Sequence, residues 1–257
     1  MAIHSTAIVD SRAELDSSVE VGPYAVIGPQ VRIDAGSSVG PHAVIEGRTR
    51  IGKRNRIFQF AALGAIPQDL KYAGEPTELE IGDDNQIREF TTLHIGTAGG
   101  AGVTRLGNGC LVMANAHVAH DCQVGSQVVL ANSVALGGHV EVRDHAILGG
   151  LSAVHQFTRI GQYAFLAGGA MVVMDVPPYC MAHGDRAELT GLNAIGLSRH
   201  GFSTEVVGHI KAAYRLLFRC GLQMQDALAK VQAEFAAVPE VLVLTDFIQA
   251  SNRGVIR

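Results

Sequence analysis

A repeat of six residues runs through most of this chain and restricts what it can fold into. Between residues 106 and 172 every sixth residue is Leu, Val or Ile, and the residue four places later is mostly small. A period of six matches neither the 3.6-residue period of a helix nor the simple alternation of a strand. It predicts a solenoid whose short flat sides each bury one aliphatic side chain, with a small residue at each tight corner. The aliphatic positions are Leu106, Val112, Val118, Val124, Leu130, Leu136, Val142, Leu148, Val154, Ile160, Leu166 and Val172.

The same period starts at Ile3 and continues to Leu63, and it is then interrupted twice, by insertions near residues 64–80 and 96–105. Insertions in a solenoid usually form loops on one face, and often on the binding face. The first insertion is charged and bounded by prolines, so we expect it to contribute to a functional site. The second is rich in Gly, Ala and Thr, and we expect it to be flexible and to carry little chemistry.

The repeat ends at a turn that Pro177 and Pro178 enforce. From Ser203 onward apolar residues recur at helical spacing, and two further helical stretches follow at about 224–237 and 239–251. These patterns predict two parts, a rod over residues 1–190 and a C-terminal α-helical domain over residues 191–257.

Composition excludes several classes of function. A formal net charge of −4 and a sequence pI near 6.2 give no electrostatic footprint for DNA or RNA. The start of the chain lacks the features of a signal peptide, and no apolar run is long enough for a membrane helix. Four cysteines without paired spacing indicate reduced thiols and a cytoplasmic protein.

The repeat resembles that of the hexapeptide-repeat transferases, which implies an all-β left-handed parallel β-helix with eighteen residues per coil. The hexads that begin at Val118, Leu136 and Val154 are eighteen residues apart and would stack on one face. Adjacent coils are separated by about 4.8 Å. A group of histidines would therefore line one outer face within about 10 Å along the rod. These are His117, His120, His139 and His155.

Three interpretations of this histidine face are open. A histidine next to Asp121 suits general-base catalysis of a transfer to a hydroxyl group. Three histidines also hold zinc between subunits in the γ-type carbonic anhydrases, a related β-helix family. Against a metal site, no further Cys or carboxylate cluster completes the ligand set, and the histidine spacing differs. A purely structural role is hard to reconcile with four histidines stacked on one face.

A closer resemblance rests on residues 68–77 of the first insertion and on three histidine-bearing segments, Ala116–Cys122, Leu136–Val140 and Ala153–Phe157. It covers essentially the whole chain and is to the UDP-N-acetylglucosamine O-acyltransferases, which start lipid A biosynthesis. The resemblance implies a homotrimer with the active site in the cleft between adjacent rods. It implies transfer of an (R)-3-hydroxyacyl group, held as the phosphopantetheine thioester of acyl carrier protein, to the 3-hydroxyl of UDP-N-acetylglucosamine, with no cofactor and no metal.

The resemblance also implies a role for individual residues. His120 would be the general base, Asp121 would orient its imidazole, and the backbone N–H of Gly138 would stabilise the oxyanion. Gly168 would set the length of the acyl chain, since a residue without a side chain leaves the acyl groove open. The other residues would bind the sugar, the acyl group or the nucleotide: Gln68, Asp69, Lys71, His117, His139, His155, Gln156, Asn193 and Arg199.

Two positions depart from the pattern of that family. Ile195 stands where an acid is usual, which bears on recognition of the uracil or ribose and on whether a 3-amino sugar is accepted. His200 stands where a second Arg is usual, which bears on how tightly phosphate or carrier protein is bound.

Two alternative functions remain. The first is the sister N-acyltransferase, which is disfavoured because the repeat already begins at Ile3. The second is a non-enzymatic scaffolding rod, which is disfavoured by the uneven set of His, Gln and Asp.

Overall fold

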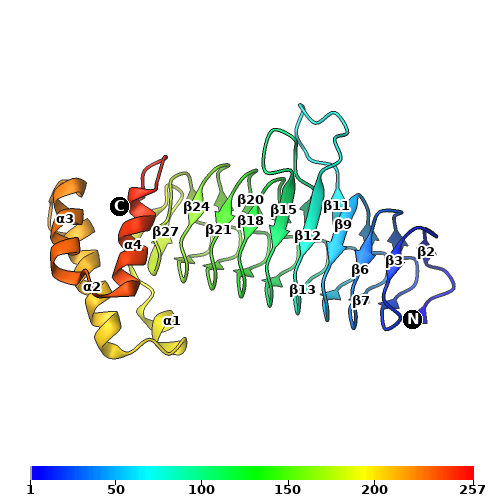
Figure 1. Cartoon of the computed structure of the whole chain (residues 1–257), viewed down its shortest axis with the longest axis horizontal. Coiled ribbons are helices and arrows are strands. Elements are labelled where there is room, and N and C mark those ends of the chain that lie inside the picture. The colour runs from blue at the N-terminus through cyan, green and yellow to red at the C-terminus, as the bar shows by residue number, and fades with distance from the viewer. Residues whose placement is uncertain (1) are drawn as a thin grey trace.

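The computed structural model describes residues 2–257, so Met1, the first residue of the predicted rod, lies outside them. The chain forms a long rod of short parallel strands with a group of helices at its C-terminal end (Figure 1). Three sheets, A, B and C, form the three sides of the rod. Sheet A contains β1 (Ala2–Ile3), β4 (Glu20–Val21), β7 (Ser38–Val39), β10 (Arg56–Ile57), β13 (Gln86–Ile87), β16 (Leu111–Val112), β19 (Val129–Leu130), β22 (Ile147–Leu148), β25 (Phe165–Leu166), β27 (Cys180–His183) and β28 (Glu188–Leu192).

Sheets B and C complete each coil. Sheet B contains β2 (Ile8–Val9), β5 (Val26–Ile27), β8 (Val44–Ile45), β11 (Ala62–Ala65), β14 (Thr92–His94), β17 (His117–Val118), β20 (Ala135–Leu136), β23 (Ala153–Val154) and β26 (Met171–Val172). Sheet C contains β3 (Glu14–Leu15), β6 (Arg32–Ile33), β9 (Arg48–Ile51), β12 (Glu78–Ile81), β15 (Val103–Leu106), β18 (Gln123–Val124), β21 (Glu141–Val142) and β24 (Arg159–Ile160).

Strand register follows the six-residue period. Val118 pairs with Leu136, and Leu136 pairs with Val154, each eighteen residues further along. All three side chains are buried inside the coil, as are the small corner residues Ala116 and Cys122. The parallel β-helix predicted from the repeat is therefore confirmed, and from Val21 to Val172 the aliphatic residue of each hexad is buried inside the coil.

The corners of the rod place selected side chains on its outer edges. Most corners contain one residue with positive φ, and many of these residues are not glycine. Asp121, His139 and Phe157 occupy the same corner position of three successive coils, with φ values of 59°, 61° and 64°. Because this conformation is uncommon for bulky residues, stacking between successive coils compensates for it: the rings of His139 and Phe157 are 4.3 Å apart and nearly parallel.

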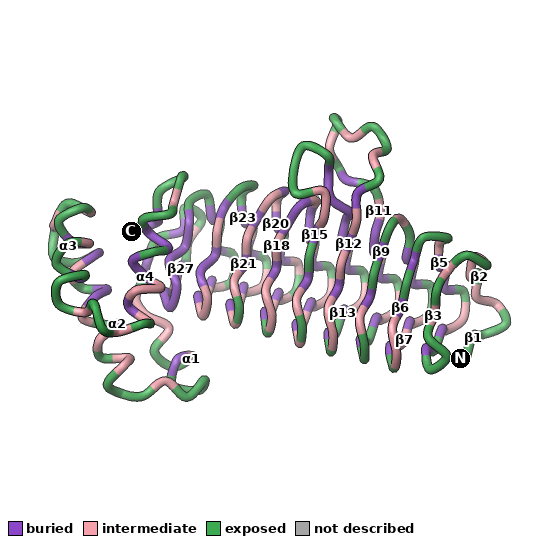
Figure 2. Tube along the Cα trace, viewed as in Figure 1, coloured by how far each residue is buried: buried purple, intermediate pink, exposed green. Residues whose placement is uncertain are grey.

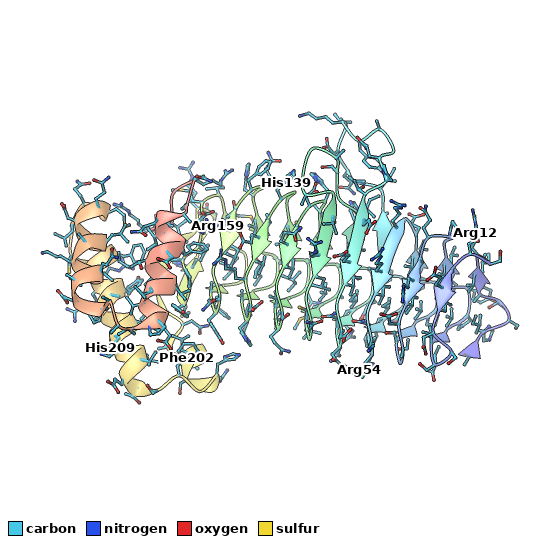
Figure 3. All side chains as sticks on the ribbon, viewed as in Figure 1. Arg12, Arg54, His139, Arg159, Phe202 and His209 are labelled. Atoms are coloured by element: carbon cyan, nitrogen blue, oxygen red, sulfur yellow. The ribbon has the colours of Figure 1, made fainter. Side chains whose placement is uncertain are left out.

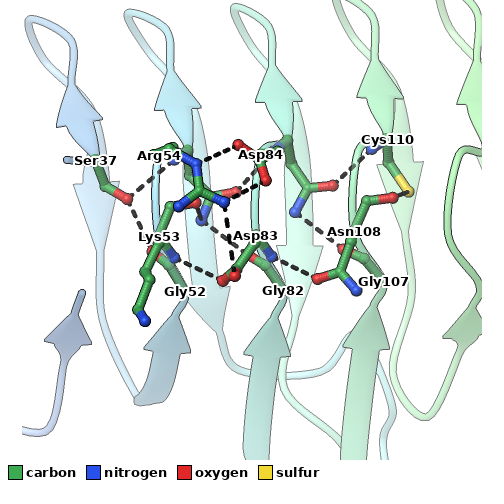
Figure 4. Close-up of polar contacts among 12 residues, drawn as sticks. Ser37, Gly52, Lys53, Arg54, Gly82, Asp83, Asp84, Gly107, Asn108 and Cys110 are labelled. Carbon is green, nitrogen blue, oxygen red and sulfur yellow. Dashed lines mark hydrogen bonds and ion pairs between the residues drawn. The ribbon is translucent and has the colours of Figure 1, made fainter. Parts of the chain in front are cut away.

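Buried asparagines replace the small corner residues in part of the N-terminal half. Figure 4 shows the polar contacts along these corners, from Ser37 to Cys110. The side-chain oxygen of Asn55 accepts from Asn85 N–H, and the oxygen of Asn85 accepts from Cys110 N–H. Each side-chain NH₂ donates to a backbone carbonyl of a neighbouring coil, Gly82 and Gly107 respectively. A buried amide costs little stability when its hydrogen bonds are made, so Asn is accepted where the repeat predicts a small residue.

The two insertions form loops that rise from the same side of the rod (Figure 1). The first joins β11 to β12 and the second joins β14 to β15. Their outer parts are exposed, whereas buried residues recur along the strands beneath them (Figure 2). Both breaks in the period are thus loops on one face, as the sequence predicts.

Helices cover the C-terminal end of the rod: α1 (Ala194–Arg199), α2 (Thr204–Phe218), α3 (Met224–Phe235) and α4 (Pro239–Gln249). Ser203 caps α2 through a hydrogen bond from Val206 N–H to its hydroxyl oxygen. Arg159 of the last coil ties α4 to the rod, since its guanidinium donates to the carbonyls of Phe247 and Ala250. Within residues 2–257, no helix combines the length and the apolar character that crossing a bilayer requires.

The two ends of the rod differ. At the C-terminal end β28 runs antiparallel to β27, and the chain's last residues pair with the turn after β26 through a bridge between Asp175 and Val255. At the N-terminal end, β1, β2 and β3 each pair with one strand among the described residues. The first coil is correspondingly exposed, with Ile3 and Ile8 accessible to solvent.

Candidate active site

His120 and Asp121 form a hydrogen-bonded pair at the corner between sheets B and C. His120 Nδ1 lies 2.8 Å from Asp121 Oδ2, and the Asp121 side chain is fully buried. Because the ionised carboxylate only accepts hydrogen bonds, Nδ1 carries the hydrogen of the neutral imidazole. Nε2 is then left with its lone pair free, and none of residues 2–257 forms a hydrogen bond to it. This is the arrangement of an oriented general base.

The second insertion holds Asp121 in place. Both the N–H and the hydroxyl of Thr97 donate to its carboxylate, the hydroxyl at 2.6 Å, and Gly102 N–H donates at 3.1 Å. Burial by itself would raise the pKa of Asp121, but hydrogen bonds from Thr97 and His120 hold that pKa below its usual value. The expectation that this insertion carries little chemistry is wrong, because its backbone folds over Asp121 and supplies hydrogen-bond donors.

Gly138 lies against the imidazole of His120 on the next coil. A Cβ atom built on Gly138 would be 2.6 Å from both Cε1 and Nε2 of His120, so only glycine fits there. The Gly138 N–H has no hydrogen-bond acceptor among the described residues, although Gly138 is buried. A free donor beside a free imidazole nitrogen is the pairing that an acyl-transfer site requires.

His139 and the first insertion adjoin this pair. The rings of His139 and His120 meet edge to face, with centroids 5.0 Å apart, and His139 Nε2 is 3.9 Å from Asp121 Oδ2. Burial lowers the pKa of His139, whereas the carboxylates of Asp121 and, more weakly, Asp69 oppose that shift. Asp69 belongs to the first insertion, whose loop rises on the same side of the rod as His139 (Figures 1 and 3). Its neighbour Lys71 is exposed and donates its backbone N–H to the Asp69 carboxylate, and Gln68 is also exposed.

His117 lies on β17 and extends the site along sheet B. Its Nδ1 is 2.7 Å from the hydroxyl of Thr92, and its ring meets that of His94 edge to face at 4.9 Å. Burial lowers the pKa of His117 and, more strongly, that of His94, which falls to about 4. Both rings are therefore neutral at pH 7, and His94 Nδ1 is a buried polar atom that forms no hydrogen bond with any of residues 2–257.

His155 and Gln156 follow one coil later, on the C-terminal side of Gly138. Both side chains are exposed. Arg253, near the end of the chain, donates to the Gln156 carbonyl at 3.1 Å and lies 3.3 Å from His155 Nδ1. The C-terminal segment therefore returns to the rod and borders the histidine face.

Comparison with known proteins gives this arrangement a family. A family model described as "Udp N-acetylglucosamine O-acyltransferase; Domain 2" matches residues 175–256, and one described as "Bacterial transferase hexapeptide (six repeats)" matches residues 104–138. An acyl-[acyl-carrier-protein]–UDP-N-acetylglucosamine O-acyltransferase from Myxococcus xanthus is 62% identical and aligns over 99% of both chains.

Solved structures agree with the sequence matches. The structure of LpxA from Acinetobacter baumannii matches with a TM-score of 0.97 at 45% identity, over 100% of both chains. A UDP-N-acetylglucosamine O-acyltransferase from Moraxella catarrhalis matches with a TM-score of 0.96 at 46% identity, also over 100% of both chains. The chain belongs to the UDP-N-acetylglucosamine O-acyltransferase family. It is therefore an acyltransferase with the left-handed parallel β-helix and the helical C-terminal part of that family.

Asn193 and Arg199, which are expected to bind the nucleotide, lie away from the histidine face. Asn193 is the N-cap of α1, accepting from Gly196 N–H, and Arg199 is in its last turn. In Figure 1 α1 lies on the opposite side of the rod from the insertion loops, and in Figure 3 His139 lies on the loop side. One copy of the chain thus does not bring these two residues to the histidines.

The two departures from the family pattern are both on or next to α1. Ile195 is 71% exposed. His200 packs edge on against His145 and Tyr163, with centroids 5.1 Å and 5.2 Å apart, and its Nδ1 bonds to the Gly196 carbonyl. His200 therefore contributes to anchoring α1 on the rod.

Gly168 lies at an open corner of the rod, beyond β25. A Cβ atom built there would have only the Gly150 carbonyl oxygen within 4 Å, at 3.3 Å. The space above Gly168 is therefore free to accept a side chain or part of a ligand.

Three side chains of the site are of kinds that can bind a metal ion. One ligand atom each from His120, Asp121 and His139 lies within 4.8 Å of the others. However, both oxygens of Asp121 already accept hydrogen bonds from Thr97, and Gly102 N–H donates to Oδ1 as well. An ion would have to displace several of these bonds, so the residues fit a hydrogen-bonded carboxylate better than a metal ligand.

Three residues of this UDP-N-acetylglucosamine O-acyltransferase site are missed by the sequence analysis: His94, Thr97 and Arg253. A signal existed for His94, which follows Leu93 by one place as His155 follows Val154. Because Leu93 pairs with Val118, extending the stacked face back across the second insertion identifies it. Thr97 and Arg253 carry no such signal, since their positions depend on the paths of a loop and of the C-terminal segment.

Proposed function

We propose that the chain transfers an (R)-3-hydroxyacyl group from acyl carrier protein to the 3-hydroxyl of UDP-N-acetylglucosamine, the first step of lipid A biosynthesis. One observation carries the chemical part of the proposal. The free Nε2 of His120, backed by Asp121, lies against Gly138, whose N–H is also free. The acceptor and the carrier-bound donor are those named for the Myxococcus xanthus relative.

The reaction follows from this pair of groups. His120 Nε2 takes the proton of the sugar hydroxyl while the hydroxyl oxygen attacks the thioester carbonyl carbon. Gly138 N–H stabilises the negative charge that develops on the carbonyl oxygen. The tetrahedral intermediate then collapses, the carbon–sulfur bond breaks, and the departing thiolate receives the proton from the imidazolium. Asp121 keeps the imidazole in the tautomer that can accept a proton and stabilises its positive charge.

The remaining residues would bind the two substrates. Gln68, Asp69 and Lys71 of the first insertion would contact the glucosamine and acyl hydroxyls. His117, His139, His155 and Gln156 would line the sugar and acyl sites; His117 and His139 are kept neutral by burial and so suit polar, uncharged groups. Asn193 and Arg199 would meet the nucleotide, whose diphosphate suits a guanidinium group.

A complete site would need more than one copy of the chain. Because α1 and the histidines are on opposite sides of the rod, the nucleotide residues would come from a neighbouring copy. A homotrimer, with three equivalent clefts between rods, supplies this arrangement by closed symmetry.

We further propose that the reaction needs no metal or other cofactor and takes place in the cytoplasm. The cysteines fit this location, because all four are free thiols. Dialysis against a strong chelator should leave the rate of transfer unchanged. Loss of activity that zinc alone restores would instead favour the carbonic-anhydrase-like interpretation.

An acyl-transfer assay tests the proposed function. The purified protein is incubated with (R)-3-hydroxyacyl-acyl carrier protein and either UDP-N-acetylglucosamine or the UDP-3-O-acyl-glucosamine that carries a free amine. We expect an ester product from the first acceptor and no amide from the second. An amide product would assign the chain to the N-acyltransferase of the pathway, and no product from either would support a non-enzymatic rod.

A further inference from the structure

We propose that Thr97 is a positioning residue for catalysis and acts on His120 through Asp121. The proposal rests on the proposed function, because it assigns part of the machinery of that same reaction. Thr97 lies in the loop between β14 and β15, in a stretch whose composition gives no sign of a catalytic role.

Thr97 binds the Asp121 carboxylate through two donors, its backbone N–H and its hydroxyl. Its hydroxyl is 2.6 Å from Oδ2, and its N–H is 3.2 Å from Oδ1 and 3.1 Å from Oδ2. Oδ2 is also the atom that accepts from His120 Nδ1. The oxygen that orients the imidazole is therefore itself fixed by the Thr97 hydroxyl, and rotation of the carboxylate would break both contacts.

The rest of the loop closes around the same carboxylate. Gly102 N–H donates to Oδ1, and the Asp121 backbone N–H donates to the Thr104 hydroxyl. A Cβ atom on Gly100 would lie 2.4 to 2.6 Å from the three carboxylate atoms of Asp121, so the loop backbone packs directly on the carboxylate there. By contrast, a Cβ atom on the adjacent Gly99 would meet nothing within 4 Å.

The consequence is a carboxylate that is buried, ionised and fixed in orientation. An Asp121 that turned away would leave His120 free to rotate and to adopt the other tautomer, and its positive charge during proton transfer would lose a counter-charge. Thr97 is thus expected to affect the chemical step rather than the binding of either substrate.

Substitution of Thr97 tests the proposal. Thr97→Val keeps the shape and the backbone donor but removes the hydroxyl, and Thr97→Ser restores the hydroxyl. We expect Thr97→Val to lower kcat by about tenfold or more, the effect of losing one hydrogen bond to a charged group, with KM for both substrates unchanged. Thr97→Ser should retain most of kcat. Thr245→Val serves as a control, because that buried hydroxyl in α4 donates to the Leu242 carbonyl within its own helix.

A double-mutant cycle separates positioning from general support of the fold. If Thr97 acts through Asp121, Thr97→Val should cost little further activity in an Asp121→Ala background, because the partner is already absent. A purely structural contribution would lower activity by the same factor in both backgrounds, and that result would overturn the proposal.

The two adjacent glycines provide an independent test that leaves Thr97 unchanged. Gly100→Ala should displace the carboxylate and lower kcat. Gly99→Ala makes the same chemical change one residue away and should behave like the wild type. Equal activity of the two variants would overturn the proposal. Failure of the proposed function is distinguishable: it would leave the wild-type protein without transfer to UDP-N-acetylglucosamine, whereas failure of this proposal would leave active wild-type protein with an unaffected Thr97→Val variant.

Discussion

The imidazole of His139 meets the imidazole of His120 edge to face, with ring centroids 5.0 Å apart and ring planes at 89°. The contact joins two successive coils, since His139 N–H also donates to the His120 carbonyl. A regular backbone step therefore fixes the spacing of the two rings, and no flexible loop contributes to it. Removal of one ring by substitution should therefore leave the backbone pairing of its coil unchanged.

His120→Ala should abolish acyl transfer and leave the fold intact. The side chain is at an outer corner, so its loss removes the base and leaves the filled interior unchanged. Loss of a general base lowers the rate by about a hundredfold or more. The rate of transfer and the thermal unfolding midpoint would be measured together. His42→Ala is a matched control, because His42 is also a corner histidine with positive φ but stacks on Tyr24 and Phe60. A variant of His120 that keeps more than a tenth of the rate would remove this residue from the role of base.

Two inactive variants should restore activity when they assemble together. Co-expression of His120→Ala with Arg199→Ala creates interfaces in which an intact His120 of one copy faces an intact Arg199 of the next. If the two variants assemble at random into cyclic trimers, about a quarter of all sites will have this composition. Activity would be compared with that of each variant expressed alone. No activity beyond the sum of the two would mean that each site lies within one chain.

Gly168→Met should shift the donor preference towards shorter acyl chains. The added side chain would occupy the open space above this corner, and each buried methylene contributes about 0.8 kcal/mol, or about fourfold in affinity. Two carbons would then change selectivity by more than about tenfold. Competing 3-hydroxyacyl donors of graded length would be compared on both proteins, with Gly208→Met on the exposed face of α2 as a control. Coinciding profiles would show that another residue sets the length.

Acid should destabilise the fold through His94. Burial lowers the pKa of His94 to about 4 in the folded protein, whereas an unfolded histidine has a pKa of about 6.5. Between these values the unfolded chain binds a proton that the folded chain does not, so the free energy of unfolding falls as the pH falls from 6.5 to 4. The full contribution is about 3 kcal/mol.

His94→Phe should remove this part of the pH dependence. Urea unfolding at several pH values and one fixed protein concentration would give the slope of the free energy of unfolding against pH for both proteins. His117, whose pKa burial also lowers, is present in both proteins, and because its ring contacts His94, a His117→Phe variant measured in parallel gives its own share of the slope. Identical slopes would show that His94 is protonated in the folded protein or does not differ between the two states.

The rod was predictable because its information is local and repeated. A buried aliphatic residue at Val118 requires another at Leu136 and at Val154, and the period fixes which residues stack. His120 and Asp121 are neighbours in sequence at a corner, so their pairing also follows from the local pattern. The insertions were visible as breaks in the period, although their shape was not.

The remaining parts of the site depend on contacts between distant segments. Thr97 reaches Asp121 only because the second insertion folds back over the next coil, and no periodicity describes that path. Arg253 reaches His155 from the other end of the chain. Asn193 shows a different limit: an Asn before a short helix indicates a cap, which it is, but the side of the rod on which α1 lies is set by the packing of its neighbours.

The unequal ends of the rod limit how copies can join lengthwise. The free strand edges of β1, β2 and β3 could pair with another chain, as exposed edges do in aggregating proteins. At the opposite end other parts of the chain cover the last coil: Arg159 of β24 binds α4, and the segment around Val255 pairs with the turn after β26. The helices and the C-terminal segment therefore shield the strands at their end of the rod from edge-to-edge pairing with another chain.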